Sequence, residues 1–172
     1  MFGFYLVDNN YIQYLKQYDR QIPDVLYINN NKFVCGTVLN INGHDYYAPV
    51  SHFSKKQRTS FAIIQKGEII SSVRLCFMFP LPKGMDVLQK LDFNLIAQTD
   101  LNYANLLRYE YSYCLRNMNQ LMNQASKVYK IGTNKKHVFN YTCCDFLKLE
   151  SICDNYDPST NYHLTTEKTT QN

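Results

Sequence analysis

The chain has 172 residues, a formal net charge of +4 and 45% hydrophobic residues. This length suits one well-cored domain and is short for two, so we expect one domain over residues 1–153. No apolar run approaches the roughly 18 residues that a membrane-spanning helix needs, and no secretory signal is recognisable. These features exclude an integral membrane protein and favour a cytoplasmic location.

The N-terminal part predicts a strand, a helix and a loop. Residues 2–7 are mostly apolar and predict the strand. Asp8 or Asn9 can then cap a helix, because a short polar side chain can accept hydrogen bonds from the first turn. Residues 21–31 contain a proline and three successive asparagines, a composition typical of a loop.

A hairpin follows this loop. Asn42-Gly43 separates two β-rich runs, residues 33–41 and residues 44–48. Asn-Gly is a strong short hairpin signal, because both turn positions need positive φ. We expect Pro49 to end the second strand, since proline has no backbone N–H to donate to a sheet.

A second hairpin is predicted after a polar and basic loop at residues 50–59. Its strands are residues 60–65 and residues 69–78, and its turn contains Lys66-Gly67-Glu68. Prolines and a glycine after this hairpin interrupt the β pattern and end the sheet.

From Val87 onward the pattern is helical. Apolar residues alternate at intervals of three and four, which aligns one stripe along a single long helix. Such a stripe is most simply core packing. Gly132-Thr133-Asn134 closes this helix, and a last short helix is expected over residues 143–152. The stripe comprises Ala104, Leu107, Tyr111, Cys114, Met118, Leu121, Ala125 and Val128.

The order of these elements predicts an α+β fold, since strands come first and helices later. A compact antiparallel sheet or open β-barrel would be covered by helices, mainly from the C-terminal half. Residues 154–172 are rich in Asn, Thr and Ser and poor in large apolar residues, which predicts a disordered tail.

Two stretches of the chain, residues 46–67 and residues 111–144, contain no acidic residue. If the fold brings them together, they would form one positive surface suited to RNA phosphates. Solvated faces also collect lysines, so the charge pattern alone leaves both interpretations open. The basic residues of these stretches are Lys55, Lys56, Arg58, Lys66, Arg116, Lys127, Lys130, Lys135 and Lys136.

The sequence offers few groups for catalysis. Its six cysteines and four histidines show no zinc-ligand spacing. The basic stretches lack the carboxylates that a two-metal nuclease needs, and neither a P-loop nor a nucleophile elbow is present. We therefore expect no metal, no cofactor and free thiols.

The remaining candidate site is the loop at residues 50–59. A metal-free ribonuclease uses the 2′-hydroxyl of its RNA as the nucleophile, so the protein orients the phosphate, stabilises transition-state charge and moves protons. A lysine can serve as the base where burial or neighbouring cations lower its pKa. Histidine also titrates near neutral pH, although a loop histidine such as His52 is often simply exposed. A solvated hairpin loop would have the same composition.

Four segments carry a resemblance to a known family. They are Tyr11-Ile12-Gln13-Tyr14-Leu15-Lys16 with Asp19, Lys32-Phe33-Val34-Cys35-Gly36-Thr37-Val38-Leu39, Gly43-His44-Asp45-Tyr46-Tyr47-Ala48-Pro49-Val50-Ser51, and Lys55-Lys56. Their order resembles the ToxN/AbiQ family, the toxins of type III toxin–antitoxin systems, and within it the AbiQ type of abortive-infection protein. The resemblance spans roughly residues 2–150 and is specific over about the first 60.

The resemblance implies a compact β-barrel core like that of the Kid and MazF toxins, with helices added. It implies a metal-independent endoribonuclease that leaves a 2′,3′-cyclic phosphate. The implied inhibitor is a small repeat RNA that folds as a pseudoknot, often within closed, RNA-bridged oligomers. The implied output is growth arrest during phage infection, a form of antiviral defence.

The resemblance also assigns site residues. Lys32 matches the family's active-site lysine, Tyr27 lies near its active-site tyrosine, Ser51 occupies a hydroxyl position and Lys55 matches the loop lysine. His52-Phe53-Ser54 departs from the family pattern, in which Ser-Pro directly precedes the lysine. This departure leaves open whether Ser51 or Ser54 supplies the second hydroxyl, and whether His52 participates.

Two hypotheses follow. The first is an endoribonuclease that cuts substrate RNA and is inhibited by an antitoxin RNA, with Ser51, Lys55, Lys32, Tyr27 and His52 as catalytic candidates. Its RNA-binding candidates are Ser54, Lys56, Arg58, Arg116, Lys127, Lys130, Lys135 and Lys136. The second is a non-catalytic RNA-binding module, in which basic loops contact phosphates and exposed tyrosines stack on bases.

Overall fold

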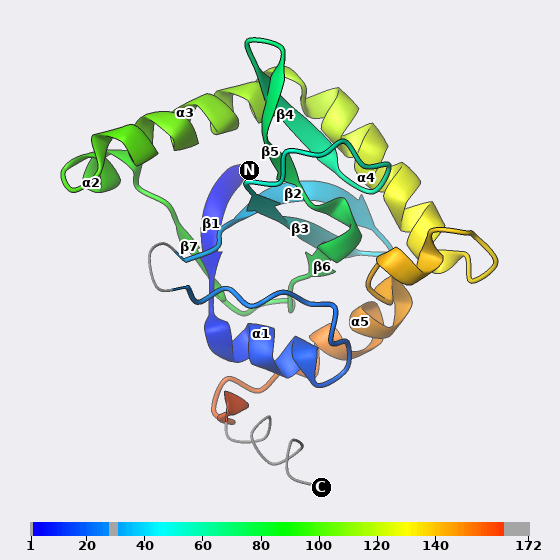
Figure 1. The fold of residues 1–172 in the computed structure, drawn as a ribbon. Helices are drawn as coiled ribbons and strands as arrows, with labels where there is room; N and C mark the ends of the chain where they lie inside the picture. The colour runs from blue at the N-terminus through cyan, green and yellow to red at the C-terminus, as the bar shows by residue number, and fades with distance from the viewer. Residues whose placement is uncertain (1, 28–30, 164–172) are drawn as a thin grey trace, which may run out of the picture.

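The computed structural model describes residues 2–27 and 31–163 (Figure 1). Within these residues, seven strands form an antiparallel sheet and five helices pack against it, so the α+β prediction is confirmed. The strands are β1 (Gly3–Val7), β2 (Val34–Ile41), β3 (His44–Ser51), β4 (Phe61–Gln65), β5 (Glu68–Val73), β6 (Phe79–Pro80) and β7 (Leu88–Lys90). The helices are α1 (Asn9–Lys16), α2 (Phe93–Ala97), α3 (Leu101–Arg116), α4 (Met118–Thr133) and α5 (Phe146–Cys153), with 3₁₀ turns η1 (Leu75–Phe77) and η2 (Asn140–Thr142).

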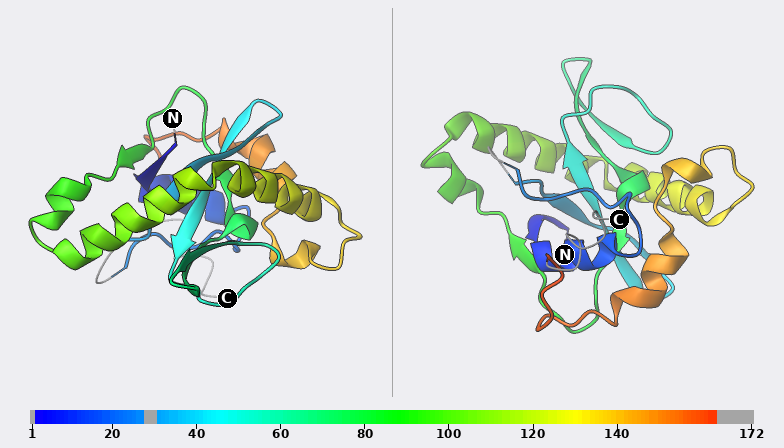
Figure 2. Two further views of the ribbon diagram at one scale, coloured as in Figure 1. Left: turned by 90° about the horizontal axis from the view of Figure 1, so that it is seen from above. Right: turned by 60° about the horizontal axis from the view of Figure 1, so that its bottom comes forward.

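The strand order is β4-β5-β3-β2-β1-β7, and β6 pairs with β3 outside this path. Because β4 and β7 form the two ends of the order, the sheet over the described residues is open. Helices α3 and α4 form an arc along one side of the strands, whereas α1 lies on the other side (Figures 1 and 2). The central strand β3 therefore has neighbours on both edges and helices on both sides.

Local turn chemistry behaves as the sequence predicts. Asn42 and Gly43 have φ values of 53° and 76°, and they join β2 to β3. Lys66 and Gly67 have φ values of 50° and 84°, and they join β4 to β5. Helix α1 is capped by Asp8, whose side chain accepts a hydrogen bond from the Asn10 N–H at 2.9 Å. Both predicted hairpins and the first helix are thus confirmed, but the strand predicted over residues 69–78 ends at Val73, and the 3₁₀ turn η1 follows it.

The expectation that Pro49 ends its strand is wrong. Strand β3 continues to Ser51, and Pro49 pairs with Val34 of β2. On its other edge β3 changes partner around this position, from β6 at Tyr46 and Tyr47 to β5 at residues 50–51. The Pro49 carbonyl accepts a hydrogen bond from the Arg74 N–H at 2.7 Å. The missing proline N–H therefore falls between two partner strands, where it interrupts no ladder.

The long single helix predicted after Val87 is also wrong in part. Strand β7 precedes the helical region and pairs with β1, with Gln89 opposite Leu6. The apolar stripe is shared by α3 and α4, which are separated at Asn117. The Asn117 side chain donates to the Tyr113 carbonyl at 2.9 Å, and such local bonds compete with helix continuation. The core role of the stripe is confirmed, because six of its residues are buried: Ala104, Leu107, Cys114, Leu121, Ala125 and Val128.

The first part of the predicted tail is packed and hydrogen-bonded. Tyr156 and Tyr162 are only 2% and 9% exposed. The ring of Tyr162 lies 4.9 Å from that of Tyr14 on α1, measured between centroids. The Asn10 side chain donates to the Thr160 carbonyl at 2.8 Å. Aromatic burial therefore overrides the polar composition over residues 154–163, and the rest of the predicted tail lies outside the described residues.

The core extends through both halves of the fold. All six cysteines are buried and unpaired, and burial raises the pKa of Cys114 and of Cys143 to about 12 and about 11.

Among the described helices, none combines the length and apolar character that a membrane span requires.

Candidate active site

The predicted site begins where β2 and β3 pair beside the loop at residues 52–60. Val34 of β2 lies opposite Pro49 of β3, and the Val50 N–H donates to the Phe33 carbonyl at 3.1 Å. Because the strands run antiparallel, extending this register by two residues sets Lys32 opposite Ser51. Opposed residues share a face of the sheet. The two predicted residues, 19 positions apart in the sequence, are therefore neighbours.

Tyr27 belongs to the same cluster. The Lys32 ammonium donates to the Tyr27 hydroxyl at 3.0 Å, and it lies 4.9 Å from the centre of the Tyr27 ring. Tyr27 is exposed, whereas Lys32 is partly buried. The structure thus joins Lys32 to Tyr27 by direct contact, and the register of β2 and β3 sets Ser51 opposite Lys32.

The Ser51 hydroxyl is buried and has no hydrogen-bond partner among the described residues. Three further buried polar atoms share this condition: Ser71 Oγ, Arg74 Nε and Glu110 Oε1. Buried polar groups normally find partners, and an exception calls for an explanation such as a ligand or water. Ser51, Ser71 and Arg74 all lie near the paired ends of β3 and β5. Ser51 and Arg74 belong to the face of the predicted site, whereas Ser71 and Glu110 lie together on the α3 side of the sheet.

Sequence reasoning missed Arg74. Ser51 pairs with Ser72 of β5, and Arg74 follows two residues later, so the three side chains share one face. The Arg74 guanidinium carbon lies 4.4 Å from the centre of the Phe53 ring and 5.0 Å from that of Phe77. No local motif marks this arginine, because its position depends on the register between strands.

The loop after Ser51 is attached to β5. The Ser72 hydroxyl donates to the Phe53 carbonyl at 2.8 Å, and the Arg74 guanidinium stacks near the Phe53 ring. These contacts hold the start of the loop against the sheet. Ser54, Lys55 and the following residues up to Arg58 are exposed. The predicted cations and the second hydroxyl therefore face solvent on a loop that is anchored at its base.

His52 lies in a different environment from Ser51. His52 directly follows the end of β3, in a turn closed by the Phe53 N–H, which donates to the Ser51 carbonyl at 2.7 Å. Burial raises the pKa of Glu110 on α3, while the Ser71 hydroxyl and the charge of His52 oppose this shift. Glu110 is only 1% exposed. His52 is thus grouped with a buried carboxylate on the α3 side, apart from the face of Ser51.

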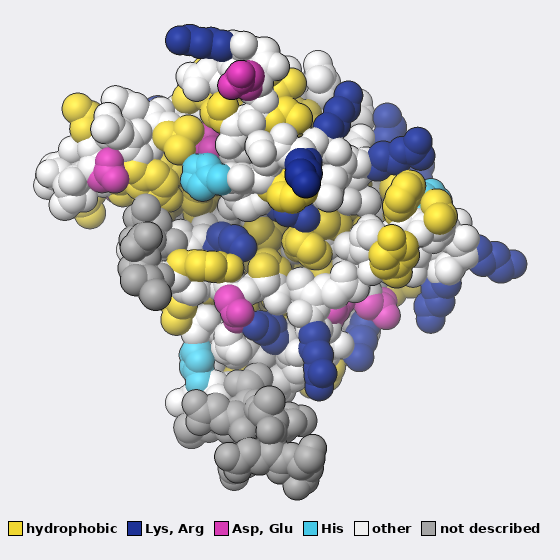
Figure 3. All heavy atoms as spheres, in the orientation of Figure 1, with side chains coloured by type: hydrophobic (Ala, Val, Ile, Leu, Met, Phe, Trp, Pro, Cys, Tyr) yellow, Lys and Arg dark blue, Asp and Glu magenta, His cyan; other side chains and the backbone are white. Residues whose placement is uncertain are grey.

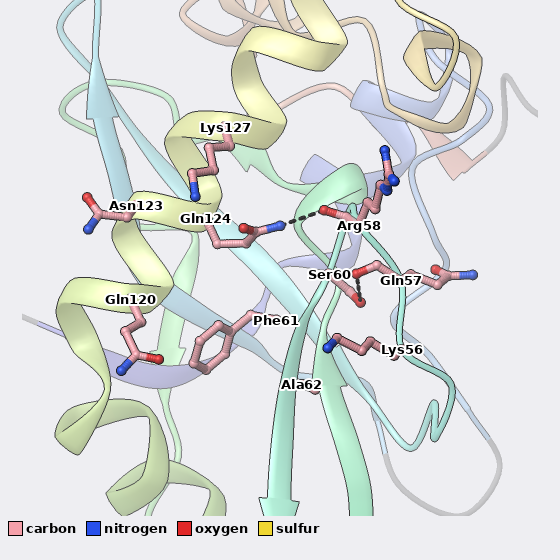
Figure 4. A pocket seen from close by; sticks show the side chains of 10 residues that line it. All are labelled: Lys56, Gln57, Arg58, Ser60, Phe61, Ala62, Gln120, Asn123, Gln124 and Lys127. Atoms are coloured by element: carbon pink, nitrogen blue, oxygen red, sulfur yellow. Dashed lines mark hydrogen bonds between the residues drawn. The ribbon is translucent and has the colours of Figure 1, made fainter.

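A groove of 680 Å³ joins the two acid-free basic stretches (Figure 4). Lys56 and Arg58 reach it from the loop, and Lys127 reaches it from α4. The Gln124 side chain donates to the Arg58 carbonyl and so connects helix and loop. In the space-filling view of Figure 3, several Lys and Arg side chains are spread over one face of the molecule with hydrophobic side chains between them. The remaining lining residues are Gln57, Ser60, Phe61, Ala62, Gln120 and Asn123.

The other predicted RNA-binding cations are dispersed. Arg116 is exposed at the end of α3, and Lys130 is exposed on α4. Lys136 lies in the exposed turn after α4. Lys135 lines a separate cavity of 310 Å³ together with Asp19 and other residues. These four side chains therefore do not join the groove of Figure 4.

One group of potential metal ligands lies elsewhere among the described residues. Atoms of His44, Cys153 and Asp154 lie within 4.8 Å of one another. Burial, with the Asp154 charge as a further cause, raises the pKa of the Cys153 thiol to about 11, which disfavours the thiolate that a metal binds. Lys83 also pairs with Asp154 at 3.7 Å. Protein contacts thus account for this group.

Comparison with known proteins places this chain in a family. The family model described as "Toxin ToxN, type III toxin-antitoxin system" matches residues 3–154. Endoribonuclease ToxN of Bacillus thuringiensis subsp. kurstaki is 29% identical over 167 residues, which cover 89% of this chain and 83% of that protein. Endoribonuclease ToxN of Pectobacterium atrosepticum is 43% identical over 51 residues, 28% of this chain and 29% of that protein.

Solved structures agree with this assignment. A toxin structure described for its selective inhibition by a non-coding RNA pseudoknot has a TM-score of 0.80 and 28% identity, covering 90% of this chain and 97% of that one. AbiQ, a lactococcal anti-phage endoribonuclease of the type III class, has a TM-score of 0.75 and 21% identity, with coverages of 91% and 98%. The chain therefore belongs to the ToxN family, the endoribonuclease toxins of type III toxin–antitoxin systems.

Proposed function

We propose that this toxin cuts RNA without a metal ion. The 2′-hydroxyl oxygen of the substrate forms a bond to the adjacent phosphorus, and the bond from phosphorus to the 5′-oxygen breaks. A protein base accepts the 2′ proton, and the 5′-oxygen leaves as a hydroxyl after receiving a proton. The products are a 2′,3′-cyclic phosphate and a 5′-hydroxyl. The observation that carries this proposal is the buried, unpartnered Ser51 hydroxyl opposite Lys32.

Each side chain of the cluster has a role in this reaction. Ser51 donates a hydrogen bond to a non-bridging oxygen of the scissile phosphate. Lys32 stabilises the negative charge that grows in the transition state, a type of contribution that is often the largest in catalysis. Tyr27 orients Lys32 through its hydroxyl, 3.0 Å from the ammonium. Lys55, on the exposed loop, exchanges protons with the 2′- or 5′-oxygen, while His52 lies on the other face and takes no part.

We further propose an RNA antitoxin as partner. The groove with Lys56, Arg58 and Lys127 combines cations with amide side chains, and these groups suit RNA phosphates and base edges. A related toxin of 28% identity is inhibited by an RNA pseudoknot. By analogy, a pseudoknot RNA binds here, bridges toxin copies and restrains the toxin in the cytoplasm until phage infection.

The alternative is a module that binds RNA without cutting it. One observation favours this binding module: Tyr141 is 76% exposed, and exposed aromatic rings stack on unpaired bases. The same exposure suits an enzyme that holds its substrate by stacking, so product chemistry must decide between the two functions.

The test incubates the full-length chain with total RNA in excess EDTA. We expect fragments that end in 2′,3′-cyclic phosphates and begin with 5′-hydroxyls. Ser51→Ala should remove the fragments while its circular dichroism spectrum and melting temperature stay those of the wild type, and Ser51→Thr should restore part of the cutting. A mobility shift without fragments would favour the binding module. Undiminished cutting by Ser51→Ala would contradict the role of Ser51.

A further inference from the structure

A second cavity lies beside the proposed active site. It has a volume of 510 Å³, within the range of small-molecule sites. Arg74 and Phe77 line it from the segment after β5, and Arg58 lines it from the loop after β3. Tyr141 and Thr142 close it from the segment between α4 and α5. The remaining lining residues are Gln21, Gln57, Thr59, Cys76 and Phe139. We call it the two-arginine cavity.

The charge of this cavity is uniform. Arg58 and Arg74 are cationic, and no carboxylate is among the described residues that line it. Within the described ranges, neither guanidinium forms an ion pair. Two guanidinium groups without a protein counter-ion at one cavity suit an anion, because a guanidinium presents planar, forked donors that match a phosphate.

Two aromatic rings lie close to the Arg74 guanidinium group and fix its position. The Phe53 and Phe77 rings lie 4.4 and 5.0 Å from its guanidinium carbon. One Nη atom lies 3.5 Å from the Gln57 side-chain oxygen, at the limit of a hydrogen bond. Its buried Nε has no partner. Aromatic contacts fix the group, and its polar protein partners are the Gln57 oxygen and the Cys76 thiol. Both are uncharged or weak acceptors, which leaves the guanidinium suited to a phosphate.

The cavity also presents an aromatic surface. The Tyr141 side chain is 76% exposed although aromatic rings are usually covered. Arg58 lies 5.6 Å from the centre of the neighbouring Phe139 ring. Proteins that bind single-stranded nucleic acid combine an exposed aromatic ring with nearby cations. The cation contacts a phosphate, and the ring stacks on a base.

Strand β5 connects the cavity to the proposed catalytic face. Arg74 lies two residues beyond Ser72, and Ser72 pairs with Ser51. Residues two apart on a strand are separated by about 7 Å, so Arg74 is one step along the sheet from the proposed scissile phosphate. A strand of RNA whose phosphate rests at Ser51 can therefore continue directly into the cavity.

We propose that the two-arginine cavity is a subsite for one unpaired nucleotide of the substrate RNA, next to the cleaved bond. Arg74 and Arg58 bind its phosphate, and Tyr141 stacks on its base. This proposal rests on the proposed function, because it takes the position of the scissile phosphate from Ser51. It adds a specificity element, since the base that stacks on Tyr141 must be unpaired.

The first experiment measures binding with an RNA that this chemistry cannot cut. The probe is a fluorescein-labelled pool of 12-nucleotide RNAs with 2′-O-methyl groups throughout, titrated with the full-length chain. We expect Tyr141→Ala to weaken binding about fivefold or more, and Tyr141→Phe to bind like the wild type. Arg58→Ala should weaken binding and lower the slope of log K against log salt by about one. Val138→Ala, an exposed position that does not line the cavity, is the matched control.

A second arm uses a fully paired duplex of the same length. Tyr141→Ala should leave duplex affinity unchanged, since a paired base cannot leave its stack to reach the ring. Affinity of Tyr141→Ala for the 12-nucleotide pool within twofold of the wild type would overturn the subsite. Equal losses for duplex and single strand would also overturn it, because they would indicate a contact to the antitoxin RNA or a general electrostatic effect.

The two proposals fail separately. If the wild type cuts no RNA in EDTA but Tyr141→Ala loses affinity for the single-stranded pool, the cavity stands and the proposed chemistry falls. If the wild type cuts RNA and Tyr141→Ala has the wild-type KM on long RNA, the chemistry stands and the subsite falls. Both proposals are supported if the wild type cuts RNA and Tyr141→Ala raises the KM for long RNA about fivefold or more while kcat changes little.

Discussion

The two faces of the sheet at the end of β3 differ sharply. One face carries the Ser51 hydroxyl, with Lys32 opposite it and Arg74 one step along the sheet. The other face lies under α3, where Glu110 is 1% exposed and His52 is the nearby histidine. Ser51 at the end of β3 thus faces cations, whereas the exposed His52, one residue beyond the strand, lies near a buried carboxyl group.

This difference shows that the pairing register of β3 with its neighbouring strands, and not residue type, decides which side chains can contact the RNA phosphate. His52 has the better intrinsic chemistry for proton transfer at neutral pH. Its position after β3 nevertheless directs it toward a carboxylate, while Ser51 faces cations. An RNA phosphate is attracted by the first face and repelled by a carboxylate on the second.

Loss of the Lys32 ammonium should have the largest effect on the cationic face. We expect Lys32→Ala to lower kcat about 100-fold, the scale for removal of one preorganised charge-stabilising group. Lys32→Arg should recover most of the rate if the lysine only supplies charge, and little if it transfers a proton. Single-turnover cleavage of one RNA measures both, with Lys90→Ala on exposed β7 as the control. A wild-type rate for Lys32→Ala would remove Lys32 from the site.

Loss of the His52 imidazole should change catalysis far less. We expect kcat of His52→Ala to stay within about threefold of the wild type, because the side chain lies on the face away from Ser51. The comparison with Ser51→Ala is matched, since the two positions are adjacent and the same RNA is used. A loss for His52→Ala as large as that for Ser51→Ala would show that both faces contribute to the reaction.

The buried carboxylate should affect stability rather than catalysis. Burial raises the pKa of Glu110 above its ordinary 4.5, so the folded chain binds this proton more tightly than the unfolded chain does. Stability is therefore lost as pH rises from about 4.5 through the folded-state pKa. We expect Glu110→Gln to raise the melting temperature at pH 7 by about 2–4 °C, the shift that about 1 kcal/mol produces at this size.

The same substitution should matter less in acid. Near pH 4 the carboxyl is protonated in both states, so the melting temperatures of Glu110→Gln and wild type should converge. Glu68→Gln, at an exposed position of β5, should show no such pH dependence. A wild type more stable than Glu110→Gln at pH 7 would mean that the Glu110 charge stabilises the fold.

Elements with local signals could be predicted. Both hairpins follow from turn residues with positive φ, and α1 follows from its Asp8 cap. The family resemblance assigned Lys32, Tyr27, Ser51 and Lys55 to the site. The Lys32 and Tyr27 side chains contact each other, the strand register sets Ser51 opposite Lys32, and the catalytic roles stay predictions. Glu110 also had a signal that sequence reasoning overlooked. Glu110 falls three residues after Leu107 and four before Cys114. This spacing places it on the same side of α3 as these two buried apolar residues.

Other features depend on distant parts of the chain. Arg74 joins the site through the pairing of β5 with β3, and the groove joins Arg58 to Lys127 through contact of a loop with α4. Strand β7 has three residues and is defined by its partner β1. Tyr156 and Tyr162 interrupt a polar segment, and only the aromatic surface of α1 explains why that segment packs.

The packing of residues 154–163 on α1 has a consequence for synthesis on the ribosome. The Asn10 side chain accepts a hydrogen bond from the Tyr162 N–H, across 152 residues. At about 5–20 residues per second, the ribosome adds that length in roughly 8–30 s. During this time the tyrosines of α1 lack their covering partners. We therefore expect the nascent chain to cover α1 only after residue 162 has been synthesised, so that products truncated before residue 154 leave the α1 tyrosines uncovered.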